Sequence, residues 1–188
     1  MNKNTQKLAF SAIMLAMSVI LNFIPVYKMP MGGEVTLLSM LPICFVSVKY
    51  GLKQGLFTSF VYSLFQLVMG IAGGNVFVYT NTFFAVVMCV LFDYLVPFTA
   101  LGLAGMFRKK GNAGIICGVA VSVFIRFVCH YLTGVVIWGQ WAENMSKYLY
   151  SIIYNGQYML PELLLTCIGT AILINVKPIR KHIIPDEE

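Results

Sequence analysis

The sequence predicts an all-α integral membrane protein, a six-transmembrane-helix bundle that forms one domain over residues 1–188. Of its 188 residues, 59% are hydrophobic and only 11% are charged, whereas a soluble domain carries about 25% charged residues. Apolar segments recur as far as the C-terminal region, and no small-residue cleavage pattern ends the first one. A secretory signal peptide therefore does not explain the hydrophobicity.

Six segments approach the roughly 20 apolar residues that a helix needs to cross a bilayer. The second is short and contains Pro42, which predicts a tilted or irregular helix. The third and fourth share a charge-free run from Gln54 to Phe92, which only the turn signal MGIAGGN interrupts. The predicted spans are 8–26, 35–48, 54–72, 82–106, 114–138 and 148–175.

Basic residues are distributed unequally over the two sides of these spans. An even number of spans places both termini on one side, and most basic residues fall there, which predicts cytoplasmic termini. The net charge of +6 is then a topology signal and gives no support to nucleic-acid binding. The predicted external loops are 27–34, 73–81 and 139–147. The basic residues on the side of the termini are Lys3, Lys7, Lys49, Lys53, Arg108, Lys109, Lys110, Lys177, Arg180 and Lys181.

The cysteines predict neither a disulfide nor a metal site. All five lie inside apolar segments at no paired spacing, where Cys usually behaves as a small hydrophobe. Cys129 and His130 are adjacent but lack the further ligands of a zinc site. The sequence also contains no ATP-binding motif and no recognisable catalytic constellation, so active transport would draw its energy from a partner or an ion gradient.

Four ionisable residues fall within the predicted spans. Such residues are costly in a bilayer, so their presence indicates a functional site. They are Asp93, Arg126, His130 and Glu162. Arg126 and His130 share a helix face because four residues separate them. Gly134 and Trp138 continue this row toward the external side, and Gly134 would leave room for a ligand ring.

Two pairings of these charges are open. Asp93 and Arg126 would neutralise each other in a purely structural arrangement, with His130 bonded to a backbone carbonyl. In the more economical pairing, Arg126 meets Glu162, which also falls near mid-bilayer. Asp93 would then have no protein cation and would suit a cationic ligand.

Aromatic residues concentrate around the short break WGQWAENMSK between the last two spans. Tyr150, Tyr154 and Asn155 begin the span that follows the break, and aromatic faces with a few polar tips suit a flat, partly charged molecule. The alternative is an interfacial belt at headgroup level. A belt explains Trp141 and Tyr148 but explains neither His130 nor Asn155.

The sequence resembles the thiamine-specific S components of energy-coupling factor (ECF) vitamin transporters over nearly its whole length. The segments that carry the resemblance are GGEVTLLSMLPICFVSVKYGLKQGL, LFDYLVPFTALGLAG, RFVCHYLTGVVIWGQWA and YSIIYNGQYMLP. The resemblance implies a thiamine-binding subunit in the bacterial cell membrane, without a cofactor of its own. The substrate-binding residues that it implies are Asp93, Tyr94, His130, Trp138, Tyr150, Tyr154 and Asn155.

The resemblance also implies docking to one transmembrane scaffold subunit and two ATP-hydrolysing subunits, with Ala12 and Ala16 of the first helix as the contact. Two departures stand out. Asp93 replaces the Glu of some members, and the first external loop offers no Trp to close the pocket. That loop carries Tyr27, Lys28, Met29 and Met31 instead.

Other functions are an S component for another vitamin or a thiamine precursor, a small intramembrane enzyme that uses His130 and Asp93 as base and acid, and a purely structural membrane scaffold. An enzyme would need a second catalytic group at helical spacing. A scaffold would not explain the polar side chains at one mouth.

Overall fold

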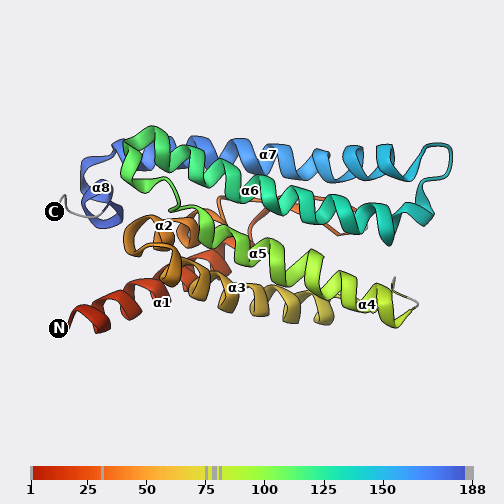
Figure 1. Ribbon diagram of the computed structural model, residues 1–188, viewed down its shortest axis with the longest axis horizontal. Coiled ribbons are helices and arrows are strands. Elements are labelled where there is room, and N and C mark those ends of the chain that lie inside the picture. Colours follow the sequence, from red (N-terminus) through yellow and green to blue (C-terminus); the bar gives the residue numbers. More distant parts are fainter. Residues whose placement is uncertain (1, 31, 75, 78–79, 81, 185–188) are drawn as a thin grey trace.

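The computed structural model describes residues 2–30, 32–74, 76–77, 80 and 82–184. Its helices lie side by side along the long axis of a bundle (Figure 1). The long helices are α1 (Lys3–Asn22), α3 (Leu52–Ala72), α6 (Gly111–Val136) and α7 (Lys147–Asn175). One further crossing is composite, made of α4 (Phe83–Cys89), η1 (Val90–Leu95), α5 (Val96–Ala100) and η2 (Leu101–Leu103). The short helices are α2 (Leu41–Tyr50), η3 (Arg108–Lys110), η4 (Trp138–Trp141) and α8 (Lys177–Ile183).

Five helical stretches of the described chain are long and apolar enough to cross a bilayer, and α2 is a shorter apolar helix. The prediction of an all-α membrane bundle is therefore confirmed. The five stretches cover residues 3–22, 52–72, 83–103, 108–136 and 147–175. Of the predicted loop 73–81, residues 75, 78, 79 and 81 lie outside the described part of the chain.

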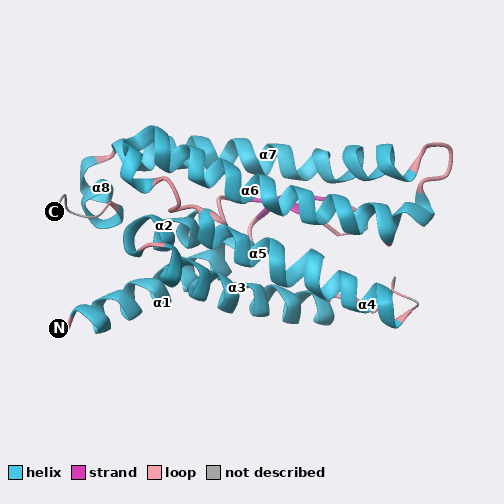
Figure 2. Cartoon of the chain, in the orientation of Figure 1, coloured by secondary structure: helices cyan, strands magenta, loops and turns pink. Residues whose placement is uncertain are grey.

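The prediction of one helix over residues 35–48 is wrong. A hairpin precedes α2, in which β2 (Glu34–Thr36) pairs antiparallel with β1 (Pro25–Lys28) (Figure 2). The helix α2 has 10 residues, so it spans about 15 Å, half the thickness of the hydrocarbon core. Most of α2 is buried inside the protein, and its apolar sequence reflects burial among other helices.

The composite crossing changes its helical winding at Asp93. Pro97 has no N–H to donate to the carbonyl of Asp93, four residues earlier, so the α-helical ladder cannot continue through this turn. The N–H of Val96 instead donates to Leu91, five residues back, as in a π-helix. The wider turn places the Asp93 side chain toward the interior of the bundle.

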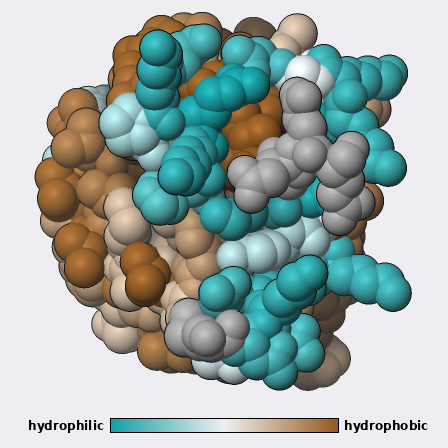
Figure 3. Space-filling model, turned by 90° about the vertical axis from the view of Figure 1, so that its left-hand side faces the viewer, coloured by the Kyte–Doolittle hydropathy of each residue, from teal (hydrophilic) through white to brown (hydrophobic). Residues whose placement is uncertain are grey.

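Polar and basic residues gather at the end of the bundle that carries both termini (Figure 3). There the ammonium of Lys49 lies 4.7 Å from the ring centre of Phe10 and also donates to the carbonyl of His182 in α8. Arg180 of α8 donates to Asn112 at the start of α6 over 2.8 Å. The sequence did not predict α8, which closes an apolar cluster around Ile174 and Ile183 at this end.

Candidate functional site

A cavity of about 510 Å³ lies between the hairpin, the composite crossing, α6 and α7. This volume is within the range of about 300–1,000 Å³ that small-molecule sites occupy. The structure brings all seven predicted substrate-binding residues to its wall. They are Asp93, Tyr94, His130, Trp138, Tyr150, Tyr154 and Asn155.

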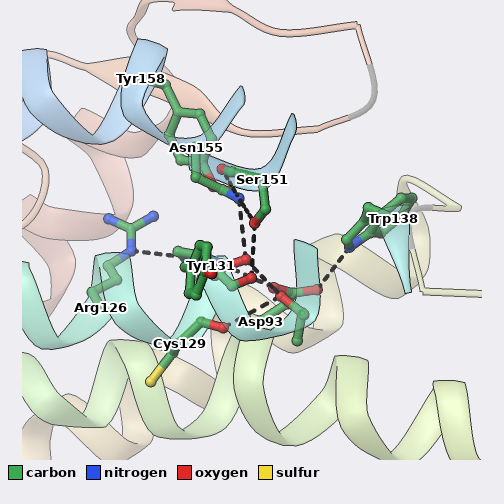
Figure 4. A network of polar contacts seen from close by, with 10 residues as sticks. Asp93, Arg126, Cys129, Tyr131, Trp138, Ser151, Asn155 and Tyr158 are labelled. Atoms are coloured by element: carbon green, nitrogen blue, oxygen red, sulfur yellow. Dashed lines mark hydrogen bonds and ion pairs between the residues drawn. The ribbon is translucent and has the colours of Figure 1, made fainter. Parts of the chain in front are cut away.

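Asp93 is the centre of a polar network in this wall (Figure 4). One carboxylate oxygen accepts from the Thr133 hydroxyl and contacts Nδ1 of His130 at 3.0 Å. The other accepts from the indole Nε1 of Trp138 at 3.3 Å. The network therefore joins the composite crossing to α6 and η4, and its side chains come from residues up to 45 positions apart.

His130 stands between Asp93 and Arg126, because Nε of Arg126 lies 3.3 Å from Nε2 of His130. A guanidinium can only donate, so Nε2 accepts and the ring proton is on Nδ1, where it is donated to Asp93. The purely structural alternative, with a direct Asp93–Arg126 pair and His130 bonded to a backbone carbonyl, is therefore not what the described residues form. In this tautomer His130 is neutral and leaves the charge of Asp93 uncompensated.

The predicted Arg126–Glu162 ion pair is also not formed. The two side chains, both described, do not come within the 4.0 Å of an ion pair. Arg126 lies over the ring of Phe98, 4.3 Å from its centre, and donates to the sulfur of Met40. Oε1 of Glu162 accepts from the backbone N–H and the hydroxyl of Thr36 in β2, over 2.6 and 2.8 Å.

The inner face of α7 contributes a row of tyrosines to the cavity. Tyr150 and Tyr154 stack with ring centres 5.7 Å apart, and Tyr158 continues the row one turn later. The hydroxyl of Tyr158 donates to Oδ1 of Asn155 over 2.7 Å, while Nδ2 of Asn155 donates to the carbonyl of His130 over 3.1 Å. The bond to His130 fixes the amide of Asn155 against α6, and the bond from Tyr158, on α7 itself, orients it.

Gly134 lines the cavity, as its predicted place near a ligand requires, but the position of its missing side chain is taken by α7 and not by the cavity. A Cβ atom at Gly134 would lie 2.1 Å from Oγ of Ser151 and 2.8 Å from Nδ2 of Asn155. The space beside Gly134 is therefore filled by α7 side chains. Glycine here permits α6 and α7 to approach closely enough for Asn155 to reach His130.

Trp138 and Trp141 share one short 3₁₀ turn, η4, after α6 ends at Val136. The predicted helix end at residue 138 is thus two residues too late. The two indoles pack against each other with ring centres 5.7 Å apart. Trp138 lines the cavity, whereas Trp141 is absent from its wall and Tyr148 is 55% exposed.

The first loop covers one side of the cavity. Lys28 and Met29 belong to the wall, whereas Tyr27 is 53% exposed and Met31 lies outside the described residues. The hydroxyl of Tyr154 donates to the carbonyl of Gly32 over 3.0 Å. Thr36 of β2 donates to Glu162 of α7, so hydrogen bonds join the hairpin to α7 at both Gly32 and Thr36.

Among the residues that sequence reasoning missed are Tyr158 and Gln66, which line the cavity, and Thr133, which donates to Asp93. Tyr158 follows Tyr150 and Tyr154 at the same spacing of four, which was a usable signal. Thr133 and Gln66 carried no signal, because a single hydroxyl or amide in an apolar span is common. Across the described chain, no three His, Cys, Asp or Glu side chains are grouped as metal ligands.

Comparisons of the whole chain with known proteins identify its family and its fold. The sequence profile of a family described as "Thiamine transporter protein" matches residues 8–182. The thiamine transporter ThiT of Bacillus subtilis is 32% identical, with 95% of this chain and 96% of the relative covered. ThiT of Lacticaseibacillus paracasei is 27% identical, with 89% and 86% covered. A solved structure of ThiT from Listeria monocytogenes superposes with a TM-score of 0.71 at 23% identity, covering 94% of this chain and 97% of that one, and shares the fold.

Proposed function

The chain belongs to the thiamine transporter protein family, and we propose that it captures thiamine from the external side for import. It is a multi-pass membrane protein of a transport family, which sets aside the intramembrane enzyme and the purely structural scaffold. Thiamine joins a flat aminopyrimidine to a thiazolium with a fixed positive charge, and a site for it needs aromatic faces beside an anion.

One observation carries the proposal. Asp93 presents a carboxylate to a cavity lined by Trp138, Tyr94 and a row of tyrosines, and its neighbour His130 is neutral. In the proposed pose the aminopyrimidine stacks on Trp138 and the thiazolium lies at Asp93. The charge of the thiazolium then replaces the protein cation that Asp93 lacks.

Titration of the purified, detergent-solubilised protein with thiamine tests this function. We expect saturable heat in calorimetry and quenching of tryptophan fluorescence as the ligand stacks on Trp138. Biotin, an anionic vitamin, is the matched control and should produce neither signal. A folded, monodisperse protein that binds biotin but not thiamine would assign it to another vitamin.

We further propose that both termini are cytoplasmic and that α1 docks on the scaffold subunit of an ECF transporter, whose two ATPase subunits supply energy. Within the apolar 18-residue stretch of α1, only 11% of the residues are buried inside the protein, the smallest share of the five spanning stretches. Ala12 and Ala16 are both exposed on it, one turn apart. Small residues at this spacing permit close approach of a partner helix. The basic end of the bundle supports the orientation.

A further inference from the structure

The cavity continues inward past Asp93. Arg126 of α6 and Trp138 of η4 lie on opposite sides of the Asp93 network (Figure 4). On the facing helix α7, Glu162 follows Asn155 by seven residues, which places it about 10 Å farther along the helix axis. Both Arg126 and Glu162 line the cavity. The cavity therefore has a second polar end, opposite the mouth at Trp138.

The carboxylate of Glu162 is only half satisfied. The residue is 1% exposed, and Thr36 supplies both donors to Oε1. Among the described residues, Oε2 has no hydrogen-bond partner. A buried carboxylate oxygen without a donor costs free energy, so such an atom in a cavity wall is suited to a donor from a ligand.

Arg126 does not fill this role. Its guanidinium donates to His130 and Met40 and stacks on Phe98. It therefore leaves Oε2 of Glu162 without a donor. The inner end offers an acceptor, in contrast to the aromatic mouth.

We infer that Oε2 of Glu162 accepts a hydrogen bond from the hydroxyl at the end of the thiamine hydroxyethyl arm. This rests on the proposed function and on the pose given there. With the aminopyrimidine at Trp138 and the thiazolium at Asp93, the hydroxyethyl arm extends inward toward Glu162. Oε1 of the same side chain accepts from Thr36. The carboxylate of Glu162 therefore accepts from the hairpin through one oxygen and from the ligand hydroxyl through the other.

This contact makes Glu162 a specificity-determining residue. A phosphate ester at the hydroxyl removes the donor and places negative charge against the carboxylate, which penalises the phosphorylated ligand. An analogue with ethyl in place of hydroxyethyl loses only the donor. The site thus selects the free alcohol of the vitamin over both analogues.

Calorimetry with thiamine and the ethyl analogue tests the assignment on the wild-type protein, Glu162→Gln and Thr36→Val. Glutamine can keep its carbonyl oxygen on Thr36, while its amide N–H₂ takes the place of Oε2 and can only donate to the oxygen of the ligand hydroxyl. We expect the wild type to prefer thiamine over the ethyl analogue by about tenfold or more, and Glu162→Gln to reduce this preference, because a neutral hydrogen bond is weaker than one to a carboxylate. Thr36→Val removes one loop bond and should weaken both ligands alike, with the preference kept.

Thiamine monophosphate gives a second readout. Its affinity relative to thiamine should rise in Glu162→Gln, because the repelling charge is gone. A wild type that binds thiamine and the ethyl analogue equally well overturns the assignment without any variant. So does a folded Glu162→Gln that keeps the full preference of the wild type. A wild type that binds none of the three ligands overturns the proposed function, and this assignment with it.

Discussion

The indole N–H of Trp138 donates to Oδ2 of Asp93 over 3.3 Å, so the predicted stacking residue and the predicted anionic residue form one unit. The other oxygen of Asp93 is taken by His130 and Thr133. His130 in this tautomer, Thr133 and Trp138 are all neutral donors to this carboxylate. These neighbours thus orient the Asp93 carboxylate without neutralising its charge, which faces the cavity.

Replacing Asp93 by Asn should weaken thiamine binding by more than tenfold, and by more than Arg126→Met does. The amide nitrogen cannot accept from Trp138 or His130, and the charge facing the thiazolium is lost. Calorimetry on both purified variants measures the two losses. Equal losses in two folded proteins would show that the charge of Asp93 does not face the ligand.

The two tryptophans of η4 should differ in their contribution to binding. Trp138→Ala should cost roughly 1 to 3 kcal/mol of thiamine affinity, by analogy with base–aromatic stacking. Trp141→Ala should cost less, because its ring contacts Trp138 at 5.7 Å and is absent from the cavity wall. Fluorescence titration of both variants makes the comparison. If Trp141 is the costlier loss, the ligand stacks on Trp141 and the proposed pose on Trp138 is wrong.

The parts of this site that follow from helical periodicity could be predicted from the sequence. Arg126 and His130 on α6, and Tyr150 and Tyr154 on α7, repeat at intervals of about one helical turn, so the sequence alone places each pair on one face. Trp138 follows His130 by eight residues, about two turns, and lies in η4 just beyond the end of α6. Asp93 stood out because a carboxylate in a membrane span is expensive. These signals are local or depend on composition, so they can be recognised without knowing how the helices pack.

The parts that depend on contacts between distant segments could not be predicted. Thr36 and Glu162 are 126 residues apart, and nothing in either local sequence indicates that a hairpin strand ends on α7. The Arg126–Glu162 pair failed because depth in the bilayer does not determine side-chain direction. Arg126 turns toward His130 and Phe98 instead. The apolar sequence of α2 was likewise ambiguous between a spanning and a buried helix.

Glu34 should make stability depend on pH. Burial raises the pKa of Glu34 above 4.5, opposed by the charges of Lys28 and Arg126. Because the pKa of Glu34 is higher in the folded than in the unfolded state, the protonated side chain stabilises the fold at pH values below the unfolded-state pKa. This stabilisation is lost as pH rises through the folded-state pKa. Glu34→Gln should therefore unfold at a higher temperature than wild type near pH 7, and the difference should vanish by about pH 4.

Thermal unfolding in detergent measures this effect, and Lys28→Met is the matched control. Lys28 lies 3.9 Å from the Glu34 carboxylate, so its removal takes away a favourable charge and should lower the unfolding temperature near neutral pH. If Glu34→Gln is instead less stable than wild type near neutral pH, the ion pair outweighs the cost of burial.

Ala12→Leu or Ala16→Leu should abolish thiamine uptake in cells that contain the complete transporter, while ligand binding by the isolated subunit stays intact. A larger side chain separates α1 from a closely packed partner helix but reaches no residue of the cavity. Ile13→Leu, at a position 59% exposed on the same helix, keeps the volume and should keep uptake. Normal uptake by both alanine variants would mean that another face docks.

Gly134→Ala should reduce both stability and thiamine affinity, because the added methyl overlaps Oγ of Ser151 and Nδ2 of Asn155. Overpacking of this kind costs about 1 to 3 kcal/mol, and displacement of Asn155 breaks its bond to His130. Gly156→Ala is a matched control on α7, since its Cβ would meet only Leu160 at 3.9 Å and alanine favours the helix.

The double variant Gly134→Ala, Ser151→Gly isolates the cause of that loss. Glycine at 151 removes the two Ser151 atoms, Oγ and Cβ, that would lie 2.1 and 2.9 Å from the new methyl. Thermal unfolding and calorimetry should then show affinity recovering with Asn155 back in place, even though an extra helix glycine costs about 1 kcal/mol of stability. If neither property recovers, the contact between α6 and α7 at Gly134 is not what positions Asn155. The amide would then owe its place to Tyr158, whose hydroxyl donates to it from within the same helix.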